Sequence, residues 1–256
     1  TSIGIAVSSP ASLSSEELLR NADLAMYLAK SQGKGKHIVF EAKMHEALME
    51  RIELEEDLRR GIEQREFVLH YQPILDLQSN KMVGMEALVR WMHPRLGLLA
   101  PMRFIPMAEE TNLIVPLGEW ILGEACRQVQ TWRDQYPDDL DVAVTVNISI
   151  RQFLQAELVE LVSRALENSG LPPHSLILEI TESFMMQDTE ATIDKLHELK
   201  KLGVRLAIDD FGTGYSSLSY LQRFPIDMLK IDKSFIDKLG QGSEGNAVAK
   251  AIIMMG

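Results

Sequence analysis

The chain has 256 residues, which is enough for one large domain or for a domain joined to part of another. Hydrophobic residues make up 46% and charged residues 25% of it, a composition typical of a folded globular protein rather than a disordered one. The formal net charge of -11 argues against general binding to DNA, RNA or an anionic membrane. An anionic ligand would therefore need bound cations or a few well-placed basic side chains.

One cysteine, Cys126, stands in the chain, so no internal disulfide can form. A reducing compartment such as the cytoplasm fits this, and we expect Cys126 to be a small buried hydrophobic residue in a helix. No signal peptide is visible, and no apolar run approaches the ~20 residues of a membrane span. Thr1 is not an initiator methionine and opens inside a strand-like run. We therefore expect a piece of a longer protein, whose preceding part could hold a membrane anchor.

The first elements of the chain are short and few. Residues 1–7 predict a strand, 15–31 a helix capped by Ser14 or Ser15, and 37–40 a short strand. One helix and two short strands cannot bury a complete core. This segment is therefore expected to be the remainder of a larger domain.

The pattern changes further along the chain. A charged stretch with apolar residues four apart, 42–64, predicts a connector helix. Strand-like and helical runs then alternate, which predicts a parallel sheet with crossover helices, either closed into a barrel or open and doubly wound. The predicted strands are 67–74, 83–91, 142–150, 176–183, 204–210 and 227–232, and the predicted helices lie near 103–135, 151–168, 188–202, 215–223 and 244–255.

Several of these strands carry polar residues within apolar runs. Side chains alternate between the two faces of a strand, so Glu86, Leu88 and Arg90 share one face of theirs. Lys230 likewise lies between Met228 and Asp232 on one face. A carboxylate in a buried strand costs free energy unless it is paired or binds a metal. If the strands are parallel, the following polar residues converge at their carboxyl ends: Glu86, Asn147, Glu179, Asp209 and Asp210.

Carboxylate and amide oxygens are hard ligands, which favour Mg²⁺ or Mn²⁺ over zinc. The adjacent acids Asp209 and Asp210 can serve two ions, and paired metals roughly 3.5–4 Å apart stabilise an in-line phosphoryl displacement. Gly212 and Gly214 follow these acids in a loop that can approach a ligand closely. None of the six histidines has a metal-ligand spacing. Phosphoester hydrolysis is the chemistry that this pattern favours.

A set of motifs follows along the chain. They are MEALVRW with Glu86-Ala87-Leu88, Tyr71-Gln72-Pro73, Asn147-Ile148-Ser149, LEITES at 178–183, DDFGTGYSSLSYL at 209–221 and LKIDKSF at 229–235. This set resembles the EAL family of bacterial cyclic di-GMP phosphodiesterases over about residues 55–256. The resemblance implies an α/β fold, a (β/α)8 TIM-like barrel, which hydrolyses cyclic di-GMP to linear pGpG with Mg²⁺ or Mn²⁺.

The same resemblance implies residue roles. Two divalent ions are expected. Lys230 would hold or polarise the attacking water, and Glu182 would anchor the loop 210–217. The implied ligands of one ion are Glu86, Asn147, Glu179 and Asp209, with Asp209 and Asp210 binding the other; the implied nucleotide contacts are Gln72, Leu88 and Arg90, the last suited to a phosphate oxygen.

The resemblance extends to the two ends of the chain. The stretch NADLAMYLAKSQGKGKH at 21–37 resembles the C-terminal part of a GGDEF domain, in which the position of Lys30 contacts GTP phosphates. Members of the EAL family continue with two more strands that carry another metal-site Glu and a Gln. Either the chain is truncated at Gly256, which we expect because the other motifs are intact, or it lacks a metal ligand and would be impaired as an enzyme. The expected boundaries are 1–41 for the GGDEF remnant, 42–64 for the connector and 65–256 for the EAL domain.

Two other functions fit the same pattern. One is a receptor without catalysis that binds cyclic di-GMP and signals by a change of conformation. Such receptors usually have a damaged metal site, whereas this chain retains the following residues: Glu86, Asn147, Glu179, Asp209, Asp210 and Lys230. The other is a protein-interaction module for which the nucleotide is irrelevant. Pairing of two copies through the region near 210–221 is also implied by the resemblance.

Overall fold

The computed structural model describes residues 1–8, 14–31, 35–137, 142–182, 190–212 and 223–237. The chain forms two compact units, Thr1–Arg60 and Gly61–Gly256. The helix predicted at 42–64 is confirmed as α2 (Lys43–Gln64), and the boundary between the two units falls within it. Among the described residues, no helix is both long enough and apolar enough to cross a bilayer.

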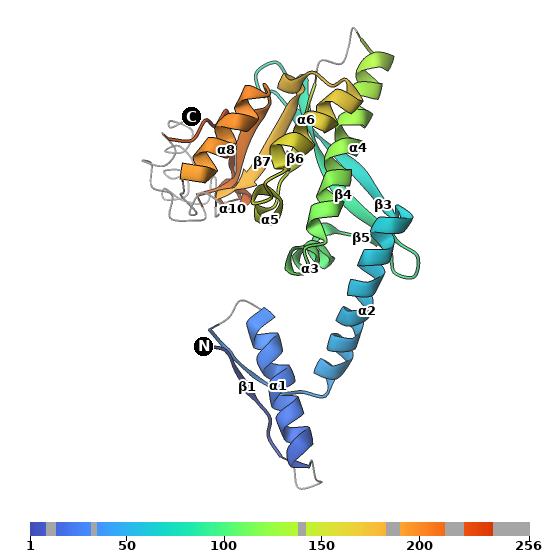
Figure 1. Ribbon diagram of the computed structural model, residues 1–256, viewed down its shortest axis with the longest axis vertical. Helices are drawn as coiled ribbons and strands as arrows, with labels where there is room; N and C mark the ends of the chain where they lie inside the picture. The colour runs from blue at the N-terminus through green and yellow to red at the C-terminus, as the bar shows by residue number, and fades with distance from the viewer. Residues whose placement is uncertain (9–13, 32–34, 138–141, 183–189, 213–222, 238–256) are drawn as a thin grey trace. The chain divides into compact units, whose positions relative to one another are not determined.

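The first unit is built from a helix and two short strands (Figure 1). Strand β1 (Ile3–Ile5) pairs in parallel with β2 (His37–Val39), and α1 (Ser15–Ser31) contacts both. The strands are shorter than the predicted 1–7 and 37–40, while the helix has the predicted bounds.

Two residues explain this local structure. The amide of Glu17 donates to Oγ of Ser14 at 3.2 Å, and the amide of Ser14 donates to Oε2 of Glu17 at 2.8 Å, so Ser14 rather than Ser15 caps α1. Gly4 lies so close to α1 that a Cβ would come within 1.9 Å of the Ala22 carbonyl oxygen. Only glycine allows β1 to approach the helix at this point.

The second unit contains one sheet with the strand order β3-β4-β6-β7-β8-β9, and β5 pairs with the edge of β4 (Figure 1). The pairs from β4 to β9 are parallel, as the alternating pattern predicted. The pair of β3 with β4 is antiparallel, so the expectation of parallel pairing was wrong there. The strands are β3 (Phe67–Leu75), β4 (Met82–His93), β5 (Gly97–Leu99), β6 (Ala143–Asn147), β7 (Leu176–Thr181), β8 (Arg205–Phe211) and β9 (Met228–Ile231).

The short links explain why β3, β4 and β5 run antiparallel. A parallel crossover needs about a dozen residues or more, and the link from Leu75 to Met82 is shorter than that. Its turn is closed by the Ser79 amide, which donates to Asp76 Oδ1 at 2.6 Å. In the turn between β4 and β5, Nδ1 of the buried His93 accepts hydrogen bonds from the backbone amides of Arg95 and Leu96. The sequence did not predict β5, because three residues carry too little periodicity.

Two predicted helices are each divided in the structure. The run 103–135 breaks at Asn112, whose φ of 61° lies outside the helical region. The run 151–168 is interrupted after Phe153. The helix predicted at 188–202 is confirmed as α8, whereas those at 215–223 and 244–255 fall outside the described residues except for residue 223. The described helices of this unit are η1 (Pro101–Arg103), α3 (Ile105–Glu110), α4 (Ile114–Gln135), α5 (Ile150–Phe153), α6 (Leu158–Ser169), η2 (Pro173–Ser175), α8 (Glu190–Lys201) and α10 (Lys233–Ile236).

The core lies where the helices cover the sheet. Helices α4, α6 and α8 follow one another beside the strands, with α4 contacting α6 and α6 contacting α8 (Figure 1). Cys126 on α4 is buried, as predicted. Strands β6, β7 and β8 are buried along most of their length. Among the described strands no pairing joins β3 to β9, so closure into an eight-stranded barrel stays a prediction.

The buried leucines of the central strands predict a stability effect. Leu178 on β7 is 1% exposed, so Leu178→Ala removes a fully packed side chain and should lower the free energy of unfolding by about 2–5 kcal/mol. Urea unfolding followed by circular dichroism measures this. Leu77→Ala is the matched control, since Leu77 is 96% exposed and its truncation should change little. Equal losses for the two variants would contradict the assigned core.

Candidate metal centre

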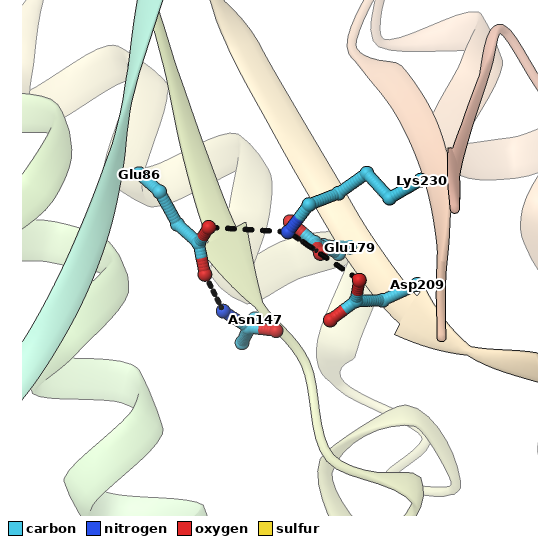
Figure 2. Close-up of polar contacts among 5 residues, drawn as sticks. All are labelled: Glu86, Asn147, Glu179, Asp209 and Lys230. Carbon is cyan, nitrogen blue, oxygen red and sulfur yellow. Dashed lines mark hydrogen bonds and ion pairs between the residues drawn. The ribbon is translucent and has the colours of Figure 1, made fainter. Parts of the chain in front are cut away.

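The parallel register brings polar side chains from five strands to one place (Figure 2). Asn147 on β6 pairs with Glu179 on β7, and Glu179 pairs with Ala207 on β8. Beneath them lies a small apolar cluster on the same face. Three of its members, Ile177, Ala207 and Met228, each precede a polar residue of the centre by two positions. The side-chain alternation predicted for these strands therefore places Glu179, Asp209 and Lys230 together on one face.

Lys230 stands at the middle of this centre (Figure 2). Its Nζ lies 3.1 Å from Oε2 of Glu86 and 3.4 Å from Oδ1 of Asp209, and it donates a hydrogen bond to Oε1 of Glu179. Asn147 completes the group, since its Nδ2 donates to Oε1 of Glu86 at 3.0 Å. The ammonium group of Lys230 on β9 thus links that strand to β4, β7 and β8.

Glu179 is the buried anchor of the centre. Its residue is 1% exposed, and its second carboxylate oxygen, Oε2, is buried without a hydrogen-bond partner among the described residues. Burial raises the pKa of Glu179 above its usual value, and the charge of Asp209 adds to this, while Lys230 opposes it. An unpaired carboxylate oxygen in a buried position is costly. A divalent cation held by this oxygen would remove that cost, so the site fits a hard metal ion.

Lys230 carries a firmly held positive charge. Burial by itself would lower the pKa of Lys230, but the hydrogen bond and charge of Glu179, with the charges of Glu86 and Asp209, raise it above its usual value. The group therefore stays protonated at neutral pH. It can donate hydrogen bonds and supply positive charge, and it is a poor acceptor of protons.

The carboxylates face Lys230 rather than a common point among themselves. Within the described ranges, no three acidic, histidine or cysteine side chains already surround one position as metal ligands do. The ammonium group occupies the space between Glu86, Glu179 and Asp209 and separates them. A cation at this centre would have to be accommodated by small movements of these side chains.

A bulge in β8 places Asp210 beside Asp209 at the centre. Ile208 pairs with Leu229 and Phe211 with Ile231, so Asp209 and Asp210 together oppose the single residue Lys230. Asp210 has a φ of 55°, a left-handed conformation that is strained for most residues but tolerated by aspartate. The bulge therefore leaves two adjacent acids where regular pairing would place one.

Asp232 joins Asp210 at this end of the sheet. The two acidic side chains lie near each other. Burial raises the pKa of Asp210, and the charges of Asp209 and Asp232 raise it further. Asp232 also caps α10, with Oδ1 accepting from the Ser234 amide at 2.9 Å. The sequence places Asp232 on the same face as Lys230 but predicts no role for it. That shared face was the feature of the sequence from which its place at the site could have been predicted.

Glu182 lies beside the start of the glycine-containing loop. It is buried, and its Oε2 accepts a hydrogen bond from the Gly212 amide at 2.7 Å. Gly212 has a φ of 102°, which favours glycine at this position. The remainder of the loop, 213–217, lies outside the described residues. The contact ties the end of β7 to the chain directly after Asp210.

The expected nucleotide contacts lie along the β3–β4 hairpin. Glu86, Leu88 and Arg90 alternate with buried neighbours, so they share one face of β4 as predicted. Gln72 pairs with Glu86 across the hairpin, which places it on that same face. Arg90 uses Nη1 to donate to the Val89 carbonyl at 2.8 Å. His70 also lies on this face, opposite Leu88. The sequence predicts only a surface or structural histidine, although the alternation of side chains along β3 places His70 on the same face as Gln72.

The model of the EAL domain family matches residues 55–256. The chain belongs to the EAL domain family. Among the curated relatives of this EAL chain, the bifunctional diguanylate cyclase/cyclic di-GMP phosphodiesterase MucR of Pseudomonas aeruginosa is 47% identical over 255 residues, covering 100% of the chain and 37% of that protein. The cyclic di-GMP phosphodiesterase PdeR of Escherichia coli is 37% identical, covering 98% of the chain and 38% of that protein. The chain spans about a third of the length of the curated relatives it matches.

Solved structures agree with this membership and with an EAL-type α/β fold. The MucR phosphodiesterase in complex with cyclic di-GMP superposes with a TM-score of 0.75 at 48% identity, covering 80% of this chain and 82% of that one. The EAL enzyme Bd1971, in a form bound to cAMP and cyclic di-GMP, gives a TM-score of 0.76 at 36% identity, covering 82% and 57% respectively.

The central ammonium group predicts a stability effect in the absence of metal. Lys230→Met leaves three carboxylates without their shared partner, so in EDTA the free energy of unfolding should fall by about 3 kcal/mol. Thermal and urea unfolding measure the loss. Arg164→Met is the control, because the ion pairs of Arg164 with Glu119 and Glu160 are exposed and should contribute under about 1 kcal/mol. Unchanged stability of the Lys230 variant would contradict the network.

Proposed function

We propose that this EAL chain carries the phosphodiesterase activity that hydrolyses cyclic di-GMP to linear pGpG in bacterial signalling. Membership of the family supports this, as do the names of MucR and PdeR and the cyclic di-GMP bound to the MucR structure. The observation that carries the proposal is the meeting of Glu86, Glu179 and Asp209 around Lys230, with one oxygen of Glu179 left unpaired.

The proposed cofactor is a pair of Mg²⁺ or Mn²⁺ ions. Glu86, Asn147, Glu179 and Asp209 would hold one ion through carboxylate and amide oxygens, and Asp209 with Asp210 would hold the other. Such ions, when bound, supply an activated water and charge stabilisation at the phosphoryl group. The buried, unpaired Oε2 of Glu179 and the bulge that presents Asp209 and Asp210 together support this assignment.

Lys230 has a role of its own in this proposal. Since the neighbouring carboxylates keep it protonated, it acts as a hydrogen-bond donor and not as a general base. Its Nζ would hold the attacking water in place and offset the negative charge that develops on the phosphoryl oxygens. The proton of the water must therefore pass to a group other than Lys230.

The hairpin face is the proposed nucleotide site. Arg90 has guanidinium donors left over after its bond to the Val89 carbonyl, and these suit a phosphate oxygen. Gln72 lies opposite Glu86 and would contact the nucleotide beside the metal centre. Leu88, between Glu86 and Arg90 on the same face, would pack against a guanine base. Glu182 would act by positioning, since it holds Gly212 beside Asp210.

The remaining proposals concern the rest of the chain. We infer that the sheet is an arc of a (β/α)8 TIM-like barrel and that 1–41 is the end of a GGDEF domain, joined by 42–64 to an EAL domain at 65–256. The alignment with MucR, whose name includes diguanylate cyclase, extends through the first unit and supports this reading. A cytoplasmic site of action and a homodimer formed near 210–221 remain predictions.

Incubation of the full-length protein with cyclic di-GMP tests the proposed activity. In the presence of Mg²⁺ or Mn²⁺ the protein should convert cyclic di-GMP to pGpG, and EDTA should stop the reaction, because carboxylates alone cannot activate water for phosphodiester attack. Chromatography of the nucleotides measures both. Binding of cyclic di-GMP without turnover would point to a receptor, and no binding would point to a protein-interaction module.

Glu86 is the proposed ligand whose loss is easiest to interpret, because it is half-buried and not the anchor of the fold. Loss of a group that merely supports a metal ligand typically costs 10–100-fold, so Glu86→Ala should lower the rate by about 100-fold or more and reduce bound metal. Steady-state rates and metal content measure this. Glu160→Ala is the control, since the ion pair of Glu160 with Arg164 is exposed to solvent. Normal metal content and rate in Glu86→Ala would contradict the assignment.

A further inference from the structure

We propose that Gln152 is a positioning residue for Asn147, and that helix α4 holds it in place through Gly118. This inference rests on the proposed function, in which Asn147 is a metal ligand. Gln152 is not among the residues assigned to the metal or the nucleotide. It is a buried polar residue, 7% exposed, directly beside the strand end that presents Asn147.

The turn after Asn147 depends on the Gln152 side chain. Oε1 of Gln152 accepts hydrogen bonds from the backbone amide of Ser149 at 3.1 Å and from Oγ of Ser149 at 3.0 Å. The backbone amide of Gln152 in turn donates to Oγ of Ser149 at 3.2 Å. This reciprocal capping box has its N-cap at Ser149, two residues after Asn147, and starts α5 at Ile150. Between them, the Ile148 amide donates to the Glu179 carbonyl at 2.8 Å, which ties the same turn to the strand of the buried anchor.

Helix α4 leaves Gln152 almost no freedom. A Cβ built on Gly118 would lie 1.8 Å from Nε2, 2.4 Å from Cδ and 2.8 Å from Oε1 of Gln152. The amide group of Gln152 therefore rests directly on the bare backbone of the helix. Any side chain at position 118 would have to displace it.

A second contact holds the far end of the same segment. Lys195 on α8 donates through Nζ to the carbonyls of Phe153 and Gln155, each at 2.8 Å. The short helix α5 is thus fixed between α4 and α8, and the position of its first turn decides where β6 ends. Asn147 is exposed and makes its bond to Glu86 from that strand end, so its placement depends on the turn behind it.

Metal binding tests this positioning role with a readout separate from activity. Mn²⁺ affinity is measured by isothermal titration calorimetry on the parent, Gln152→Ala and Gly118→Ala. Since Gln152 acts through Ser149 rather than on a ligand directly, the expected loss is at the lower end for indirect groups, about 10-fold. Gln152→Glu keeps the acceptor of the capping box and should bind Mn²⁺ within about threefold of the parent.

The chain provides matched controls. Gly123 lies on α4 like Gly118, but a Cβ there would meet nothing within 4 Å, so Gly123→Ala has the same effect on helix propensity without displacing Gln152. Gln155→Ala truncates a nearby glutamine whose Nε2, among the described residues, donates only to the Arg151 carbonyl. Both controls should bind Mn²⁺ like the parent.

Three outcomes decide the matter. The 10-fold losses, with parent-like binding by both controls and by Gln152→Glu, would support the role. Parent-like Mn²⁺ binding by Gln152→Ala would overturn it while leaving the proposed function intact. Absence of Mn²⁺ binding by the parent itself would overturn both. If Gly118→Ala fails to fold, as judged by circular dichroism, Gln152→Ala against Gln155→Ala gives the same decision.

Discussion

The ammonium group of Lys230 stands among the carboxylates of Glu86, Glu179 and Asp209, and the chemistry open to the site depends on this concentration of charge. Lys230 and Glu86 are 144 residues apart along the chain, so the contact requires the whole sheet between them to form. One ammonium cannot fully compensate three carboxylates in a half-buried site. Negative charge therefore remains uncompensated, and Oε2 of Glu179 is buried without a hydrogen-bond partner among the described residues. For this reason the centre suits an additional cation.

The sheet supports this centre by two different means. Regular parallel pairing repeats the same alternation from β6 to the start of β9, which places an apolar layer of Ala143, Ile177, Ala207 and Met228 beneath the polar layer. The bulge at Asp209 and Asp210 then interrupts the regular pairing, and it places two acids opposite Lys230. Strain at a left-handed aspartate is tolerated because the neighbouring pairs of β8 and the bond from Glu182 to Gly212 hold the chain on both sides.

Local patterns explain most of what was predictable. The strands around Val144, Leu178 and Leu206 were found because buried apolar runs of this length are strong signals. The face shared by Glu86, Leu88 and Arg90 was also correct, since alternation is a property of any extended strand. The antiparallel hairpin, the break at Asn112 and the strand β5 were missed. Each depends on a turn or a short pairing whose residues fit several conformations equally well.

By itself, then, the sequence determined the parallel part of an α/β fold, the faces of its strands, and the residue types able to hold a hard cation, because side-chain direction and ligand chemistry are set within a few residues. Tertiary structure alone decided that Lys230 would separate the acids, that Asp209 and Asp210 would share one partner, and that Asp232 would lie beside Asp210. These outcomes depend on register between strands and on a bulge. Register is chosen by the total packing of the sheet, and no short stretch of residues carries that information.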